Sequence, residues 1–86
     1  MKRYVIKDTI VNQKTNEKMV CFVGVDGYVH NSPEFADGYF RKGNALRKVQ
    51  KEVSDTFLGR NVQVSSNQYF EANLWLHTLE IMEVNQ

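Results

Sequence analysis

The sequence predicts an α+β fold in which an antiparallel β-sheet packs on one amphipathic helix. Apolar residues recur at helical spacing over residues 44–58, and the segments on both sides are rich in β-branched residues, which favour strands. Short polar or glycine-containing turns separate those segments. The expected order is strand, strand, short strand, helix, strand and strand, within one domain of residues 1–86. A sheet covered on one face by one helix is the simplest way to bury both apolar patterns.

One apolar stripe predicts the helix. Its members are Ala45, Leu46, Val49, Val53, Phe57 and Leu58. They recur three and four residues apart, which places them on one helical face. Asn44 suits the N-cap of this helix and Gly59 suits its C-terminal stop. We expect the following side chains to be buried against the sheet: Leu46, Val49, Val53 and Phe57.

The N-terminal half reads as strands and turns. Residues 3–11 form the first expected strand and residues 19–25 the second, and the polar stretch between them predicts a hairpin. Asp26-Gly27 then favours a tight turn, after which residues 28–30 return as a short third strand. A short helical turn should follow, with Ser32 at its N-cap, Pro33 at its first position and Gly38 at its stop.

Two strands are expected after the helix. Residues 61–66 predict a short strand and residues 74–84 a long last strand. The segment 69–76 stays open between strand and helix, because its apolar residues suit both.

Composition and charge exclude several classes of protein. The chain is 42% hydrophobic and 12% aromatic, which excludes disorder, and its net charge of +1 is far less basic than that of a dedicated nucleic-acid-binding domain. The one cysteine, Cys21, allows no intramolecular disulfide. No apolar run approaches the length of a signal peptide core or a membrane span. We therefore expect a cytoplasmic protein that does not associate with a membrane.

The usual catalytic and metal-binding patterns are missing from the sequence. His30, His77 and Cys21 share no ligand spacing, so we expect no metal. Cys21 and a histidine form the one conceivable nucleophile and base, and the apolar run around Cys21 predicts a buried, unreactive thiol. The glycines match no phosphate-binding loop. We expect neither enzymatic activity nor a cofactor.

A basic cluster at the helix entry is the main candidate site for nucleic acid or for another partner. Its members are Arg41, Lys42, Arg47, Lys48 and Lys51, with Tyr39 as a candidate stacking residue. Such clusters bind phosphates, and neighbouring aromatic rings stack on bases. A solvated helix face that follows core aromatics explains the same residues and is the favoured interpretation of the two.

Three segments carry a resemblance to a known group. They are KRYVIK at residues 2–7, PEFADGYF at residues 33–40 followed by Ala45, and LEIMEV at residues 79–84. They resemble small uncharacterised proteins encoded by phages and prophages of Gram-positive bacteria. That resemblance implies a phage origin and no particular activity. The stretch 38–45 also resembles the helix entry of the arm-type DNA-binding domain of phage integrases, which has three strands followed by a helix.

Two hypotheses for the function remain. The first is a non-enzymatic interaction module, derived from a phage, that binds a protein partner. The alternative is a nucleic-acid-binding accessory protein that uses the basic cluster.

Overall fold

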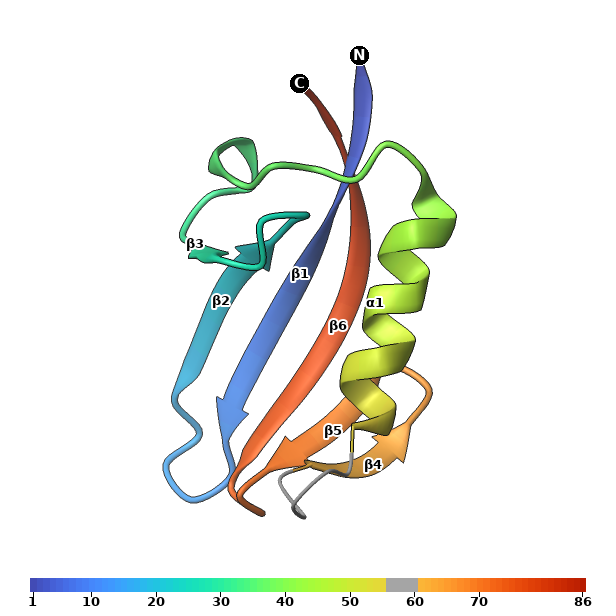
Figure 1. Ribbon diagram of the computed structural model, residues 1–86. Helices are drawn as coiled ribbons and strands as arrows, with labels where there is room; N and C mark the ends of the chain where they lie inside the picture. Colours follow the sequence, from blue (N-terminus) through green and yellow to red (C-terminus); the bar gives the residue numbers. More distant parts are fainter. Residues whose placement is uncertain (56–60) are drawn as a thin grey trace.

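The computed structural model describes residues 1–55 and 61–86, and these form a six-stranded antiparallel sheet with one α-helix (Figure 1). The sheet order is β3-β2-β1-β6-β5-β4. The elements are β1 (Lys2–Asn12), β2 (Lys18–Val23), β3 (Val29–His30), the 3₁₀ turn η1 (Pro33–Phe35), α1 (Lys42–Ser54), β4 (Asn61–Ser65), β5 (Gln68–Glu71) and β6 (Trp75–Asn85). The predicted α+β class is confirmed, and the predicted elements occur in the expected order, with β5 as one further strand between the two that were expected after the helix.

The two long strands β1 and β6 form the centre of the sheet. They pair along their whole length, from Lys2 opposite Asn85 to Asn12 opposite Trp75. The predicted hairpin joins β1 to β2, and the Asn12 carboxamide closes it by accepting hydrogen bonds from the amides of Lys14 (2.8 Å) and Thr15 (3.1 Å). An asparagine that bonds the backbone two residues further on is a common turn former.

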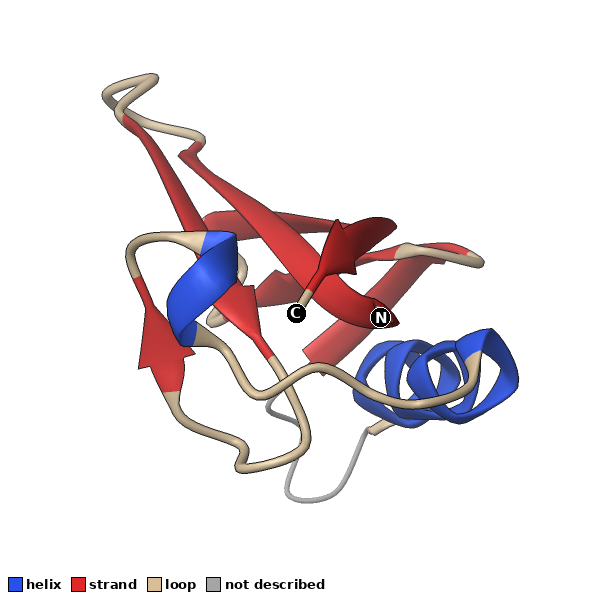
Figure 2. Ribbon diagram, turned by 90° about the horizontal axis from the view of Figure 1, so that it is seen from above, coloured by secondary structure: helices blue, strands red, loops and turns tan. Residues whose placement is uncertain are grey.

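The helix covers one face of the sheet (Figure 2). The main core cluster joins α1 to β1, β5 and β6, and its members are Ile6, Ala45, Val49, Val53, Tyr69 and Leu79. Val5 and Phe22 lie on the other face by strand alternation, where Ala36 packs against them. The residues between β3 and α1 therefore cover part of that second face.

The observed helix is shifted relative to the predicted one. It begins at Lys42 and ends at Ser54, and the N-cap position belongs to Arg41, which makes no side-chain capping bond. Val49 and Val53 are buried as predicted, but Leu46 is 46% exposed, so that prediction was wrong. The buried residues of the helix, Ala45, Val49 and Val53, are four apart, and Leu46 lies beside this line, where no strand of the described residues covers it. Phe57, Leu58 and Gly59 lie outside the described residues.

Three smaller predictions are also resolved. The short helical turn exists, but it ends at Phe35 and Ser32 makes no capping bond. Gly38 has a different reason to be glycine, because a Cβ there would lie 2.6 Å from the Arg3 Cβ. The open segment 69–76 is extended at both ends, and Ala72 and Asn73, both with positive φ, form the turn from β5 into β6.

Candidate partner-binding groove

The strand β6 is much longer than its neighbour β5. β5 pairs with β6 from Glu71 opposite Trp75 to Gln68 opposite Thr78, and the Leu79 amide then donates to the Asn67 carbonyl at 2.9 Å. β6 continues to Asn85 and stays paired with β1 on its other side. Within the described residues, no strand pairs with the second edge of β6 beyond Leu79.

Strand alternation identifies the backbone groups at this free edge. In an antiparallel sheet, the N–H and C=O of one residue point to the same side, and those of the next residue point to the other. The Leu79 amide points toward Asn67, so the backbone groups of Ile81 and Glu83 point the same way. Two donors and two acceptors thus face outward from this edge.

The helix runs beside that edge, next to the middle part of β6 in Figure 1. A hollow of about 630 Å³ lies between them, lined by Lys42, Leu46, Val49, Gln50, Ser66, Asn67, Leu79, Glu80 and Ile81. A second hollow of about 290 Å³ is lined by Tyr4, Lys42, Ile81 and Glu83. The two hollows share Lys42 and Ile81, so we treat them as one continuous channel and call it the edge groove.

The edge groove is apolar in its centre and charged at its margins. Leu46 and Ile81 contribute aliphatic surface from the helix and from the strand. Glu80 and Glu83 lie on opposite faces of β6, which contains neither lysine nor arginine. Glu83 pairs weakly with Lys2 at 4.0 Å, and both side chains are more than half exposed. The strand therefore offers a net negative edge.

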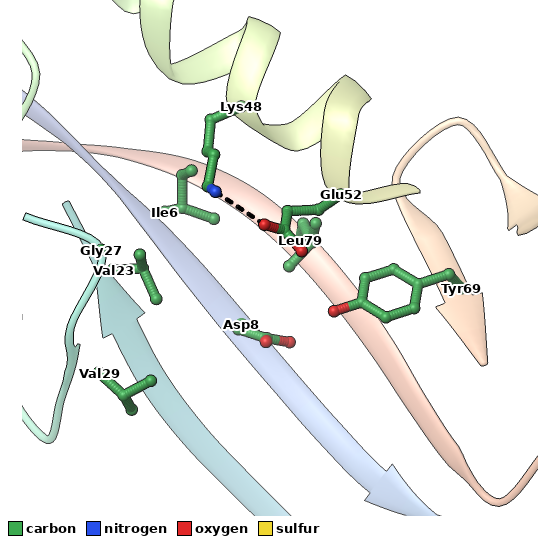
Figure 3. A pocket seen from close by; sticks show the side chains of 9 residues that line it. All are labelled: Ile6, Asp8, Val23, Gly27, Val29, Lys48, Glu52, Tyr69 and Leu79. Atoms are coloured by element: carbon green, nitrogen blue, oxygen red, sulfur yellow. Dashed lines mark ion pairs between the residues drawn. The ribbon is translucent and has the colours of Figure 1, made fainter. Parts of the chain in front are cut away.

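A separate pocket of about 210 Å³, distinct from the edge groove, lies under the other flank of α1 (Figure 3). Ile6, Val23, Val29 and Leu79 contribute apolar lining. The remaining lining residues are Asp8, Gly27, Lys48, Glu52 and Tyr69. The Lys48 ammonium and the Glu52 carboxylate pair at 2.8 Å within the lining.

A buried histidine lies beside this pocket between two carboxylates. His77 Nδ1 is 2.9 Å from Asp8 Oδ2, and His77 Nε2 is 3.2 Å from Glu71 Oε1. The Tyr69 ring stacks on the imidazole, with centroids 4.5 Å apart. Burial by itself lowers the pKa of His77, but the hydrogen bonds and charges of Asp8 and then Glu71 outweigh it and raise the pKa. A protonated imidazole donates to both carboxylates, so this network is satisfied internally.

Sequence reasoning missed the network around His77. Asp8 and His77 are 69 residues apart in the chain, and neither belongs to a recognisable motif. The available signal was the alternation of side chains along each strand, because Asp8 and His77 both occupy helix-facing positions of their strands. Within residues 1–55 and 61–86 no group of three metal-ligating side chains is assembled.

The half-buried Cys21 lies across the strand pair from Asp8. The predicted full burial of Cys21 was therefore wrong, because one side of the thiol remains accessible. Burial, followed by the Asp8 charge, still raises the pKa of the thiol.

The predicted basic residues lie on different sides of the helix. Lys42 lines the edge groove and Lys48 lines the pocket on the other flank. Arg47 and Lys51 are exposed one turn apart and line neither hollow. Arg41 is the exposed N-cap residue. Lys42 and Lys48 therefore lie on different flanks of the helix.

The two aromatic residues before the helix have structural contacts. Tyr39 is partly buried and exchanges backbone hydrogen bonds with Tyr4. Phe40 is 70% exposed, and the Arg3 guanidinium lies 3.4 Å from its ring centroid. One guanidinium nitrogen of Arg3 is buried and has no hydrogen-bond partner within residues 1–55 and 61–86.

Comparison with known proteins gives no relative. No family model, curated protein or solved structure matches this chain. Among the described helices, none is long and apolar enough to cross a membrane.

Proposed function

We propose that this protein is a non-enzymatic interaction module that binds an extended segment of a partner protein as an additional strand on β6. The observation that carries the proposal is the free edge at Ile81 and Glu83, which α1 flanks to form the edge groove. Strand addition derives affinity from main-chain hydrogen bonds and specificity from pockets for alternate side chains. The edge groove supplies both elements. The lone Cys21 suits a reducing compartment such as the bacterial cytoplasm.

The other edges of the sheet are built differently from this one. β3 contains two residues, and β4 has an irregular register between Gln63 and Ser65. Short edge strands and bulges are devices by which natural sheets prevent unwanted pairing. The free part of β6 has a continuous register with β1 and contains no proline. Residues 18–21 of β2 are also unpaired on their outer side among the described strands, but they line none of the three hollows beside α1. The free part of β6 is therefore the edge that combines outward backbone groups with a groove.

The helix favours a single extended segment over a second copy of the chain. α1 contacts β4, which lies two strands beyond β6, so the helix reaches past the free edge. Antiparallel pairing of two β6 edges across a two-fold axis would place both helices on the same face, directly facing each other. A lone segment meets no such obstacle.

Substitution of one edge residue tests this proposal. The Glu83 amide points away from β1, so Glu83→Pro should remove an outward donor and retain the sheet, since proline is tolerated at edge positions. Glu83→Thr is the matched control, because it removes the same carboxylate and keeps the N–H. Peptides selected from a displayed random library on the wild type should bind Glu83→Thr and lose at least about tenfold in affinity for Glu83→Pro.

The same selection can overturn the proposal. Selected peptides that bind wild type and Glu83→Pro equally would place the site elsewhere, and a selection that enriches no peptide would contradict a peptide-binding function. Salt-sensitive binding of short DNA or RNA by the wild type would favour the alternative function, since phosphate contacts weaken steeply with salt. Loss of that binding in the double variant Arg47→Glu, Lys51→Glu would locate it on the helix.

A further inference from the structure

We propose that the partner segment runs antiparallel to β6 and carries a basic residue opposite Glu83 and a large apolar residue opposite Ile81. This inference rests on the proposed function and specifies the chemistry of its ligand. The resulting pattern, read from the N-terminus of the segment, is basic, any residue, apolar.

The direction follows from the sheet itself. Every strand pair recorded in the sheet is antiparallel, and β5 is antiparallel to β6 immediately before the free edge begins. A segment on the line of β5 continues that geometry, with its C-terminal end next to the Ser66-Asn67 turn. Antiparallel pairing also forms perpendicular hydrogen bonds and is somewhat more stable per residue.

The apolar position follows from the groove lining. A residue directly opposite Ile81 exchanges both backbone bonds with it and points its side chain to the same face, toward α1. That side chain enters the larger hollow, beside Leu46 and Val49. Leu46 is 46% exposed in the free protein, although it lies next to buried core residues. An aliphatic or aromatic side chain would cover it.

The basic position follows from the charges along β6. The next helix-facing residue of the segment lies opposite Glu83, and opposite charges at such cross-strand positions are favourable whereas like charges are not. Glu83 has only the weak, exposed contact with Lys2 to neutralise it among the described ion pairs. Lys42 lines the same hollow, but its exposed ammonium, on a long flexible stem, can turn to water while the stem contributes apolar surface.

Four synthetic peptides, each acetylated and amidated, test the pattern and the direction. STKTLTS carries the proposed pattern, STKTSTS lacks the apolar residue, STETLTS reverses the charge, and STLTKTS is the reversed sequence. The amide signals of Ile81 and Glu83 are followed by NMR during titration to millimolar peptide, a range in which weak binding is visible.

STKTLTS should shift both amide signals and bind about tenfold more tightly than STKTSTS, because leucine burial supplies that difference. STLTKTS should bind as weakly as STKTSTS. STETLTS should bind about threefold more weakly than STKTLTS to the wild type, and the order should reverse on Glu83→Lys. Preference for STLTKTS would overturn the antiparallel direction, and equal binding of all four would overturn the pattern.

The failure of this inference differs from failure of the proposed function. If STKTLTS causes no shift while library-selected peptides bind and depend on the Glu83 N–H, the ligand chemistry is wrong and strand addition stands. If STKTLTS binds Glu83→Pro and Glu83→Thr equally, strand addition itself is wrong.

Discussion

The polar groups on the two sides of α1 differ in whether they have partners within the protein. On one side, the buried imidazole of His77 bonds the carboxylates of Asp8 and Glu71, and Lys48 pairs with Glu52. On the other side, the backbone groups of Ile81 and Glu83 face outward with no partner among the described residues. Burial of a polar group without a hydrogen-bond partner is costly, whereas a polar group that faces water forms its hydrogen bonds with the solvent. The first side therefore stabilises the fold, and the second is the side on which we propose that a partner binds.

Removal of Asp8 should have the largest effect on stability. Asp8→Ala removes the carboxylate that most favours the protonated imidazole and leaves one ring nitrogen of a buried His77 without its hydrogen bond. Breaking such a buried pair costs about 3 kcal/mol of the free energy of unfolding. Chemical denaturation measures the loss. Asp8→Asn, which retains an acceptor, should lose clearly less. A loss of under about 1 kcal/mol for Asp8→Ala would show that the network contributes little.

The core below the helix should give the next largest effect. Val49 is 3% exposed and packs within the main cluster. Val49→Ala removes two methyl groups and leaves a small cavity, which should lower the free energy of unfolding by about 2 kcal/mol. Thermal and chemical denaturation should agree. An unchanged midpoint would mean that the helix is not packed on the sheet as described.

A smaller effect should appear with pH. The pKa of His77 is raised in the folded protein, so its contribution to stability is complete below its ordinary pKa of about 6.5 and declines as pH rises through the folded-state pKa. The denaturant concentration at the midpoint of unfolding should therefore decrease as the pH is raised from about 6 to about 8. The Cys21 thiol titrates above that interval. His77→Gln should flatten this dependence. A wild-type midpoint that rises over the same interval would contradict the assignment.

The strands and the helix were predictable because their signals are local. The β-branched stretch 3–11 and the stripe at Val49 and Val53 need no knowledge of the rest of the chain. The exposure of Leu46 was not predictable in this way. Leu46 would be buried only if a strand lay beside that part of the helix, and β5 does not extend far enough along β6 to reach it.

The candidate site depends on strand lengths, which local patterns define poorly. β5 has four residues and β6 has eleven, and that difference creates the free edge. The open segment 69–76 spans the boundary between them, so the sequence concealed the mismatch. The contact of Asp8 with His77 likewise depends on the registers of β1 and β5 with β6.

The smallest change in stability is expected for Leu46→Ala, and this variant separates folding from binding most directly. Leu46 is 46% exposed, so little of its surface leaves water on folding, and alanine is the better helix former. The free energy of unfolding should change by about 0.5 kcal/mol or less.

The same side chain lines the edge groove, so binding of STKTLTS should fall severalfold while the weak binding of STKTSTS stays unchanged. A large loss of stability would place Leu46 in the core after all, and unchanged peptide binding would remove it from the groove. Val49→Ala provides the contrast, since its main effect is a decrease in the free energy of unfolding. The two variants, three residues apart on one helix, thus distinguish a side chain that mainly stabilises the fold from one that mainly contributes to binding.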